Sequence, residues 1–417
     1  MECIRIAGRR TLSGTVSVSG AKNAVLPALA ATLLTDEEIV LHNVPDVVDV
    51  ATMLRVLEHL GAQGDRDSGT VRIRTPDVRH PEAPYRLVRT MRASILTLGP
   101  LLARHGKARV SRPGGCAIGA RPVDLHLEVM RAMGAQVNLQ HGYIESRAGR
   151  LQGARFTFPT PTVTGTENAM MAATLARGQT RLEHCAREPE IDDLAVLLNR
   201  MGARIAGAGT GTMTIDGVEK LRGAEHQVIP DRIEAGTFLC AGALAGGLVT
   251  VAGCRPDHLK AVLQALRSCG VSTEIGPGSI TIKGGGDLAA CDVTTRAYPG
   301  FPTDLQAQYM VLMTQAAGKS VISETIFENR FMHVSELQRM GARIRVHGRQ
   351  ATVEGKRPLS GAPVMATDLR ASASLVLAGL IASGETLVRR VYHLDRGYEN
   401  LETKLRSLGA EISRIRE

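Results

Sequence analysis

A short pattern recurs six times along the chain, and it limits what the chain can fold into. Each copy is an amphipathic helix that ends in a bulky residue, followed by glycine and then by alanine or valine. The copies are Leu60-Gly61-Ala62, Met133-Gly134-Ala135, Met201-Gly202-Ala203, Cys269-Gly270-Val271, Met340-Gly341-Ala342 and Leu408-Gly409-Ala410. Successive glycines lie 73, 68, 68, 71 and 68 residues apart. Because glycine after the last apolar position is typical of a left-handed helix cap, we predict six repeated units, each with one capped helix.

A second helix, which we term the leading helix, precedes the capped helix in every unit. Alanine-rich apolar runs predict leading helices over residues 24–34, 93–102, 169–175, 235–244, 305–314 and 371–380. One strand follows each leading helix, as at 38–41, and two strands joined by a polar turn follow each cap, as at 203–205 and 213–215. A unit is therefore predicted to run helix, strand, helix, strand, strand, with a leading helix small enough to lie close to a sheet.

Six such units are too many for one hydrophobic core. The chain has 417 residues, whereas single cores stop growing beyond about 250–300 residues. We predict an α/β fold of two domains with three units each: residues 22–229 form one, and residues 1–21 with 230–417 form the other. Strands around Ile4 and Val16 would complete the second domain, and the two chain crossings suggest a hinge and a cleft.

The composition argues against several classes of protein. Seven cysteines without a C-x-x-C pair favour reduced thiols in the cytoplasm over a disulfide framework or a zinc cluster. We expect no metal and no cofactor. Residues 1–10 lack the apolar run of a signal peptide. The uncharged run 235–254 has the length of a membrane span. The repeat divides it into a short helix and a strand, so we expect no membrane insertion.

Charged residues occupy equivalent positions in the units, at the starts of the leading helices and in the loops before the capped helices, and we term these positions the corners. The net charge is +9. The predicted leading helices begin at Lys22, Arg92, Glu167, Arg232, Asp304, and Asp368 with Arg370, and the loops before the capped helices carry Arg121, Glu188, Glu190, Arg330, Asp395 and Arg396. A cation at a helix N-terminus costs about 0.3–1 kcal/mol if it is unpaired. A salt bridge to a neighbouring acid would offset this cost. Alternatively, both sets of corners surround one multiply anionic substrate, since helix N-termini bind phosphate.

A loop at residues 111–122 carries a lone cysteine, Cys116, between Arg112 and Arg121. Three glycines and two prolines predict a loop between ordered elements. Nearby positive charge favours the thiolate, so we expect the pKa of Cys116 to lie below the free value of about 8.5. A surface turn with an incidental cysteine is the alternative that composition alone leaves open.

Eight motifs along the chain resemble the enolpyruvyl transferase family, and within it the UDP-N-acetylglucosamine 1-carboxyvinyltransferases of early peptidoglycan synthesis. The motifs occupy residues 19–23, 90–94, 113–116, 119–126, 298–304, 327–333, 368–370 and 395–398. The Cys116 loop together with the motif around Asp304 is the specific part. The resemblance implies an inside-out α/β barrel fold. It also implies transfer of enolpyruvate from phosphoenolpyruvate to the 3′-hydroxyl of UDP-N-acetylglucosamine, with release of phosphate.

The resemblance also implies roles for individual residues. Lys22, Arg121 and Arg396 resemble holders of the phosphoenolpyruvate phosphate, and Arg330 and Arg370 resemble partners of its carboxylate, where a planar guanidinium suits bidentate binding. Asn23 and Asp368 complete that subsite by resemblance. The residues that fall where the family binds the sugar nucleotide are Arg92, Arg121, Pro122, Val123, Asp124, Leu125, Asp304 and Ile326. Cys116 resembles the proton donor and site of the covalent adduct, and Asp304 the base.

One stretch departs from the family pattern. The family usually reads Ser-Val-Gly-Ala-Thr-Glu-Asn where this chain reads Thr162-Val163-Thr164-Gly165-Thr166-Glu167-Asn168. The uridine contacts of the family run through this stretch. Because the sequence departs from the family pattern here, we do not assign residues 160–165 to the predicted site.

Two other functions are consistent with parts of the sequence. The related shikimate 3-phosphate enolpyruvyl transferase shares the repeat but lacks the cysteine loop, so residues 113–116 argue against it. A basic repeat protein that binds RNA is the second. Aromatic residues make up only 3% of the chain and no Lys/Arg run occurs, so we expect no nucleic-acid partner. The expected partners are the two small-molecule substrates, and the sequence does not indicate an oligomeric state.

Overall fold

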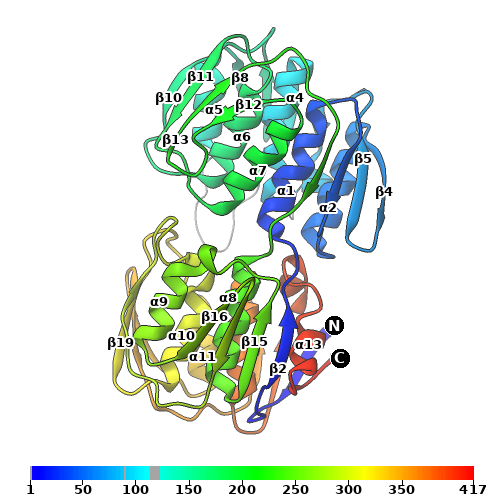
Figure 1. Cartoon of the computed structure of the whole chain (residues 1–417). Coiled ribbons are helices and arrows are strands. Elements are labelled where there is room, and N and C mark those ends of the chain that lie inside the picture. Colours follow the sequence, from blue (N-terminus) through cyan, green and yellow to red (C-terminus); the bar gives the residue numbers. More distant parts are fainter. Residues whose placement is uncertain (1, 89–90, 113–122) are drawn as a thin grey trace. The chain divides into compact units, whose positions relative to one another are not determined.

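The computed structural model describes residues 2–88, 91–112 and 123–417, and its contacts divide them into two compact units (Figure 1). The C-terminal unit holds residues 2–19 and 230–417. The N-terminal unit holds the described residues between 20 and 229.

The N-terminal unit contains three four-stranded sheets among its described residues, in the orders β14-β3-β5-β4, β6-β7-β9-β8 and β10-β11-β13-β12. Its helices are α1 (Lys22–Ala31), η1 (Thr32–Leu34), α2 (Val48–Leu60), α3 (Tyr85–Val88), η2 (Arg92–Thr97), α4 (Leu98–His105), α5 (Asp124–Ala132), α6 (Val163–Ala173) and α7 (Pro189–Arg200). Its strands are β3 (Ile39–His42), β4 (Gln63–Asp67), β5 (Thr70–Arg74), β6 (Glu82–Ala83), β7 (Lys107–Ser111), β8 (Gln136–Gln140), β9 (Tyr143–Arg147), β10 (Arg155–Thr157), β11 (Gln179–Glu183), β12 (Arg204–Ala206), β13 (Thr212–Asp216) and β14 (Ala224–Gln227).

The C-terminal unit repeats this arrangement, with sheets in the orders β2-β15-β17-β16, β18-β19-β21-β20 and β22-β23-β1-β24. Its helices are α8 (Arg232–Ala245), η3 (Pro256–Leu259), α9 (Lys260–Ser268), η4 (Thr303–Leu305), α10 (Gln306–Gln315), α11 (Val334–Arg339), α12 (Leu369–Ile381), η5 (Val391–Arg396) and α13 (Leu401–Ser407). Its strands are β1 (Glu2–Ala7), β2 (Gly14–Ser17), β15 (Leu248–Ala252), β16 (Ser272–Gly276), β17 (Ser279–Lys283), β18 (Val293–Thr294), β19 (Lys319–Ser323), β20 (Arg343–His347), β21 (Gln350–Glu354), β22 (Pro363–Met365), β23 (Glu385–Arg389) and β24 (Glu411–Arg416).

Each sheet has one strand more than the predicted unit supplies. The extra strand is short and pairs in parallel with the strand after the leading helix, as β14 does with β3 and β18 with β19. These strands are two to four residues long and carry little alternation, so among them sequence reasoning found β2 and missed the others. The predicted strands near Ile4 and Val16 are present: β1 lies between β23 and β24, and β2 pairs in parallel with β15.

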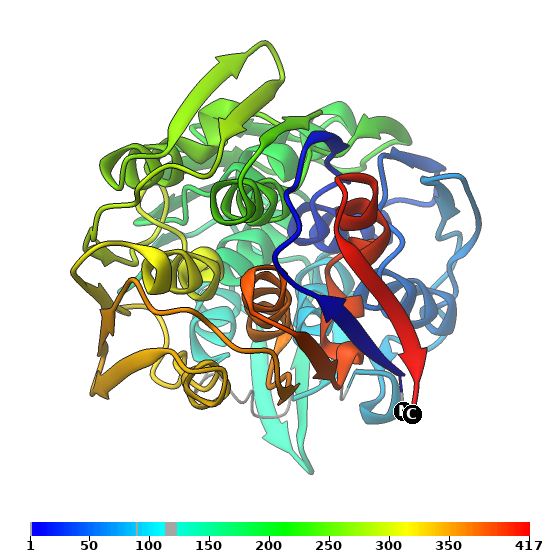
Figure 2. The same cartoon turned by 90° about the horizontal axis from the view of Figure 1, so that it is seen from below.

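The leading helices form the core of each unit, and the sheets cover them. In α1 every residue from Ala24 to Ala31 is buried, and in α12 every residue from Arg370 to Leu380 is buried. Helices α8, α10 and α12 contact one another, and Figure 2 shows these three nearly end-on, in green, yellow and orange. Helices inside and sheets outside are the arrangement of an inside-out α/β barrel, as predicted.

All six predicted caps are confirmed. The cap glycines have φ angles of +109°, +90°, +99°, +89°, +97° and +102° in chain order. In each copy the next residue donates its N–H to the carbonyl five residues back, for example Ala62 to Leu57 at 2.9 Å and Ala410 to Leu405 at 3.1 Å. This bond satisfies a carbonyl that the helix end would otherwise leave without a partner.

The start of one leading helix differs from the prediction. Helix α6 begins at Val163, with Thr162 as its N-cap, so Glu167 lies inside the helix and is buried. The Thr162 hydroxyl accepts the N–H of Gly165 at 3.3 Å, and this cap starts the helix one turn early. The uncharged run 235–254 forms most of α8 followed by β15, as predicted. Within the described residues, no helix has both the length and the apolarity required to span a bilayer.

Candidate functional site

In the C-terminal unit, Asp304 lies between two of the predicted arginines. Its Oδ1 accepts a hydrogen bond from Arg330 Nη2 at 2.8 Å, and its Oδ2 accepts one from Arg370 Nη2 at 2.7 Å. The arginine side chains are only 4% and 5% exposed, whereas Asp304 is 25% exposed. The structure therefore brings three predicted site residues together, with a carboxylate at the exposed side of two buried guanidinium groups.

Surrounding residues fix the orientation of Arg370. Asp368 caps α12, since its Oδ1 accepts the backbone N–H groups of Arg370 at 2.8 Å and Ala371 at 3.1 Å. The guanidinium carbon lies 5.5 Å from the centre of the Tyr398 ring. Burial opposes the positive charge, but Asp304, Tyr398 and Asp231 outweigh it and raise the pKa of Arg370 above its ordinary value. The group is therefore a permanent cation.

Buried polar side chains form hydrogen bonds with Tyr398 and with the backbone of Asp304. The Tyr398 hydroxyl lies 2.8 Å from Thr237 Oγ1 and accepts a bond from Gln308 Nε2 at 3.2 Å. The same Gln308 nitrogen donates to the carbonyl oxygen of Asp304 at 3.1 Å. These bonds connect α8, α10 and the segment before α13, so they hold the backbone at Asp304 in place.

The other predicted residues of this unit lie on nearby loops. Ile326 is 40% exposed in the loop after β19, and its N–H donates to Glu324 Oε1 at 2.8 Å. Arg396 is the last residue of η5 and is half-buried. Burial lowers the pKa of the nearby His393, and Arg396 lowers it further, so that imidazole is held neutral beside the arginine.

In the N-terminal unit, Lys22 forms a nearly buried ion pair. It is the first residue of α1, and its Nζ lies 3.0 Å from Asp49 Oδ2 in the first turn of α2. Only 11% of the lysine side chain and 5% of the aspartate side chain are exposed. The salt bridge anticipated for a cation at a helix start is thus present. Asn23, the next residue, is half-buried at the same corner.

The remaining described residues of the predicted sugar-nucleotide set lie at two further helix starts. Arg92 begins η2, Val123 caps α5, and Asp124 and Leu125 begin α5. Behind them His126 is buried, with Nδ1 3.0 Å from Asn168 Nδ2 and Nε2 3.2 Å from Thr164 Oγ1. Burial, with a smaller effect of Arg92, lowers the pKa of His126 to about 4.

Three predicted site residues, Cys116, Arg121 and Pro122, lie outside the described residues. Their predicted roles stay predictions, as does the expectation that the corners of both units surround one substrate. In the part of the chain that the structure describes, no group of three or more His, Cys, Asp or Glu side chains is arranged to hold a metal ion.

Sequence reasoning missed several residues that support these corners. Asp49 could have been found, because an acid in the first turn of a helix is a common partner for a neighbouring cation. His126 and Tyr398 stand within motifs that carried the resemblance, but the pattern assigned them no role. Thr237, Gln308 and Asn168 lie in apolar helices, for which the sequence alone predicts only core packing. Their pairing depends on contacts between distant segments.

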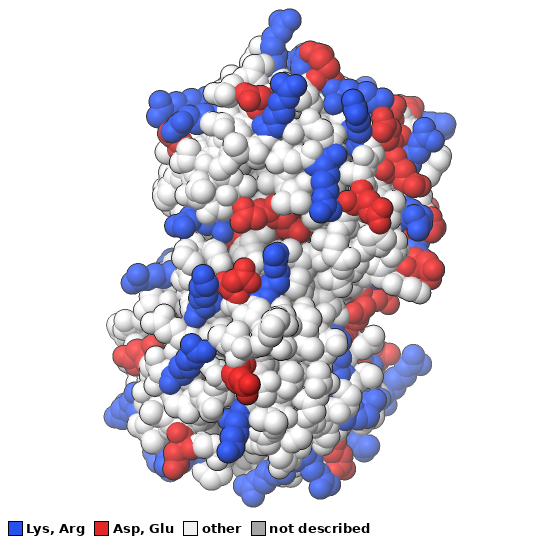
Figure 3. All heavy atoms as spheres, viewed as in Figure 1, with Lys and Arg blue, Asp and Glu red and all other residues white. Residues whose placement is uncertain are grey.

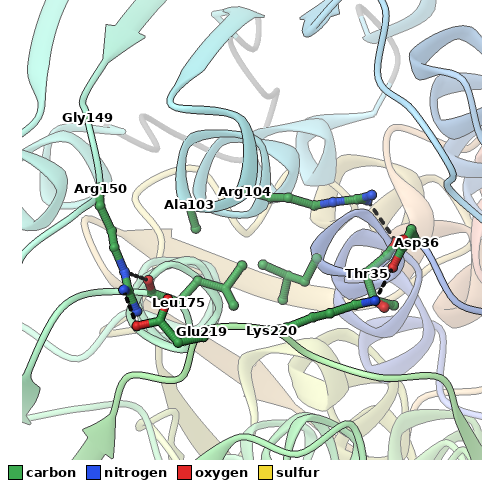
Figure 4. Close-up of a pocket in the computed structure, with 10 residues that line it drawn as sticks. Thr35, Asp36, Ala103, Arg104, Gly149, Arg150, Leu175, Glu219 and Lys220 are labelled. Atoms are coloured by element: carbon green, nitrogen blue, oxygen red, sulfur yellow. Dashed lines mark hydrogen bonds and ion pairs between the residues drawn. The ribbon is translucent and has the colours of Figure 1, made fainter.

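A pocket elsewhere in the N-terminal unit contains none of the predicted residues. It encloses about 520 Å³ and is lined by Leu34, Thr35, Asp36, Ala103, Arg104, Gly149, Arg150, Leu175, Glu219 and Lys220 (Figure 4). Its arginines are already engaged: Arg104 Nη1 donates to the carbonyls of Leu33, Thr35 and Thr75, and Arg150 Nε donates to that of Leu175. We therefore interpret these arginines as caps for helix C-termini.

Basic and acidic side chains are interspersed on the surface. On the face drawn in Figure 3, Lys and Arg lie among Asp and Glu and do not merge into one basic patch. This face therefore carries mixed charge and no continuous basic surface.

Comparison with known proteins places the chain in a family. A family model described as EPSP synthase (3-phosphoshikimate 1-carboxyvinyltransferase) matches residues 6–405. A relative named UDP-N-acetylglucosamine 1-carboxyvinyltransferase from Koribacter versatilis is 57% identical over 421 residues, which cover 100% of this chain and 97% of the relative. A relative of the same name from Anaeromyxobacter sp. (strain Fw109-5) is 58% identical and covers 99% of both chains.

Solved structures agree with this placement. The enolpyruvyl transferase NikO from Streptomyces tendae superimposes with a TM-score of 0.90 at 29% identity, covering 99% of each chain. EPSP synthase from Acinetobacter baumannii superimposes with a TM-score of 0.77 over 100% of each chain, and at 19% identity this likeness concerns the fold alone. The chain therefore belongs to the EPSP synthase family of enolpyruvyl transferases and, at 57–58% identity over its full length, to the branch whose members are named UDP-N-acetylglucosamine 1-carboxyvinyltransferase.

Proposed function

We propose that the enzyme transfers the enolpyruvyl group of phosphoenolpyruvate to the 3′-hydroxyl of UDP-N-acetylglucosamine and releases phosphate, the first committed step of peptidoglycan synthesis. The names of the full-length relatives support UDP-N-acetylglucosamine as the acceptor and a carboxyvinyl group as the group transferred. The observation that carries the proposal in the structure is Asp304, a carboxylate held by two buried arginines at a partly exposed corner. This corner suits a reaction in which anions are bound and a hydroxyl is deprotonated.

The proposed chemistry is an addition followed by an elimination. The 3′-oxygen bonds to C2 of phosphoenolpyruvate while Asp304 takes the hydroxyl proton and Cys116 gives a proton to the methylene carbon. In the elimination, the Cys116 thiolate takes back a proton from the new methyl group while the bond from C2 to the phosphate oxygen breaks, and the leaving phosphate takes the proton held by Asp304. Each general acid or base contributes about 10²–10⁴-fold. Fixed cations stabilise the charge that develops on the bound phosphate and carboxylate.

Arg330 and Arg370 connect substrate binding to the basicity of Asp304 in this proposal. Both guanidinium groups donate to Asp304 in the structure. A substrate carboxylate that takes up these donors in bidentate fashion would weaken both bonds to Asp304. The proton affinity of Asp304 would then rise, so the base would become effective only when phosphoenolpyruvate is bound. Lys22, Asn23, Arg121, Asp368 and Arg396 would hold the rest of that substrate.

We further propose a cytoplasmic location and no nucleic-acid partner. The six described cysteines, Cys3, Cys185, Cys240, Cys254, Cys269 and Cys291, are free thiols, which suits a reducing compartment. Interspersed charge, without a basic stripe on the face in Figure 3, gives little support to an RNA-binding function.

The choice of acceptor tests the proposed function. Phosphate release from phosphoenolpyruvate would be measured with UDP-N-acetylglucosamine and, separately, with shikimate 3-phosphate. We expect release only with the sugar nucleotide. Release with shikimate 3-phosphate alone would assign the chain the other activity, and release with neither would overturn the proposal. A salt titration with RNA tests the remaining alternative, for which we expect no specific binding.

A further inference from the structure

A buried chain of hydrogen bonds crosses the N-terminal unit behind the predicted sugar-nucleotide residues. The N–H of Gly99 donates to Asn168 Oδ1 at 2.6 Å, and Asn168 Nδ2 donates to the Ile95 carbonyl at 2.8 Å. The same Asn168 nitrogen lies 3.0 Å from His126 Nδ1, and His126 Nε2 lies 3.2 Å from Thr164 Oγ1. The chain joins η2, α4, α5 and α6.

The partners assign the protonation of His126. Because Asn168 Oδ1 accepts from Gly99, the amide nitrogen must face the imidazole, and it can only donate. Nδ1 is therefore the unprotonated acceptor, and Nε2 carries the proton that Thr164 Oγ1 accepts. His126 is 3% exposed and its pKa is about 4, so the ring is neutral near pH 7.

The position of His126 connects it to the proposed substrate. It directly follows Val123, Asp124 and Leu125, and the network also reaches Ile95 in η2, the helix that Arg92 begins. A buried side chain cannot touch the nucleotide, but it can fix the two helix starts relative to each other. Losing such a bond would shift groups that bind the substrate.

Thr164 supplies a hydroxyl where the family pattern has glycine, and the neighbouring residues differ in a compensating way. A Cβ atom added to Gly165 would lie 2.4 Å from Thr162 Cγ2 and 3.0 Å from Thr162 Oγ1. Serine, the usual residue at the first of these positions, lacks that methyl group, so the shortest contact with an alanine at the last position would be absent and a contact of 3.0 Å would remain. With Thr162 in this rotamer, a glycine at 165 avoids the clash.

We propose that Thr162, Thr164 and Gly165 form a coupled set and that the set makes His126 a positioning residue for the sugar-nucleotide subsite. The Thr164 hydroxyl stabilises the His126 tautomer that carries its proton on Nε2. The Thr162–Gly165 pair allows α6 to begin at Val163, so that Thr164 lies in its first turn. The proposal rests on the proposed function for its substrate, while the tautomer and the packing do not depend on that function.

Substitutions at Thr164 test the positioning role. Thr164→Val leaves the His126 N–H buried without an acceptor, so we expect the KM for UDP-N-acetylglucosamine to rise about 5–100-fold while kcat stays within about twofold. Thr164→Ser restores the hydroxyl and should restore the KM. In the parent, ¹⁵N spectra should show His126 protonated at Nε2, and Thr164→Val should shift that signal. An unchanged KM together with an unchanged His126 spectrum in Thr164→Val would overturn the positioning role.

A second set of variants tests the packing without any substrate. Gly165→Ala should lower the Tm by about 4 °C or more, because its methyl group meets that of Thr162. Thr162→Ser should have little effect alone, and Thr162→Ser/Gly165→Ala should regain most of the loss. Equal stability of Gly165→Ala and the parent, or a double variant no better than Gly165→Ala, would overturn the coupling. These readouts separate a failure of this inference from a failure of the proposed function.

Discussion

At the residue scale, Asp304 binds Arg330 and Arg370 and is the proposed general base. One substitution can test the role as base while the fold is kept. Asp304→Asn keeps the size of the side chain but removes the charge between Arg330 and Arg370. We expect phosphate release to fall about 10²–10⁴-fold, the range of a lost general base, with an unchanged circular dichroism spectrum. The exposed Asp287, which lies 3.5 Å from Lys356, provides the control. The Asp287→Asn enzyme should release phosphate at the parental rate. Near-parental turnover in Asp304→Asn would remove Asp304 from the role of base.

His333 predicts a pH dependence of stability. It is buried, and burial is the main reason that its pKa falls to about 4; Arg330 lowers it and Asp368 opposes the fall. The unfolded chain takes up this proton near pH 6.5, whereas the folded chain does so only near pH 4. The free energy of unfolding therefore decreases as the pH falls through this window, by at most about 3 kcal/mol.

His333→Gln should flatten this part of the pH profile, measured as Tm at half-unit steps from pH 7 to pH 4.5. The exposed His59 supplies the matched control, and His59→Gln should follow the parent. A profile in His333→Gln that is as steep as the parental one would contradict the assignment.

The cysteines predict a selective reaction with an electrophile. Burial raises the pKa of Cys185 and of Cys240 to about 12 and that of Cys269 to about 11, so these thiols stay protonated at neutral pH. Only a thiolate opens an epoxide efficiently. We therefore expect fosfomycin to spare these three thiols and to add at Cys116, faster when UDP-N-acetylglucosamine is present. Intact mass and peptide mapping measure this; an adduct that persists in Cys116→Ser would refute the selectivity.

At the element scale, the cap glycines can be compared because they share a backbone angle but not a neighbourhood. Gly202 has φ +99° and open space around it, so Gly202→Ala adds only left-handed strain of about 1–2 kcal/mol. Gly61 has φ +109°, and a Cβ there would lie 2.3 Å from the Asp77 carbonyl oxygen. Gly61→Ala should therefore lower the urea midpoint clearly more than Gly202→Ala. Equal losses would mean that the close approach at Gly61 relaxes freely.

At the scale of the whole molecule, substrate binding should appear as stability. A ligand that binds only the folded chain stabilises it by about 2.7 kcal/mol at one hundred times its Kd. UDP-N-acetylglucosamine should raise the Tm in proportion to the logarithm of its concentration, and shikimate 3-phosphate should not. Differential scanning fluorimetry measures both, and a shift caused by shikimate 3-phosphate alone would contradict the proposed acceptor.

Sequence reasoning recovered the repeat because it is local. Glycines such as Gly61 and Gly202 mark helix ends whatever packs around them, and alanine-rich runs identify the buried leading helices. The one misplaced helix start, at Glu167, arose because the Thr162 cap lies one turn earlier than the apolar run suggests. The short parallel strands, such as β6 and β18, were missed because pairing with a neighbouring strand, and not their own pattern, defines them.

The sequence by itself determined the six units, their caps and the residue types at the corners, because helix periodicity and the left-handed glycine are properties of a few consecutive residues. Only the tertiary structure decided which corners meet: that Asp304 bridges Arg330 and Arg370, that Lys22 pairs with Asp49, and that Asn168 faces His126. Those contacts join segments 26 to 66 residues apart. Distance along the chain carries no information about such pairs, since the packing of separate helices and loops within each unit brings them together.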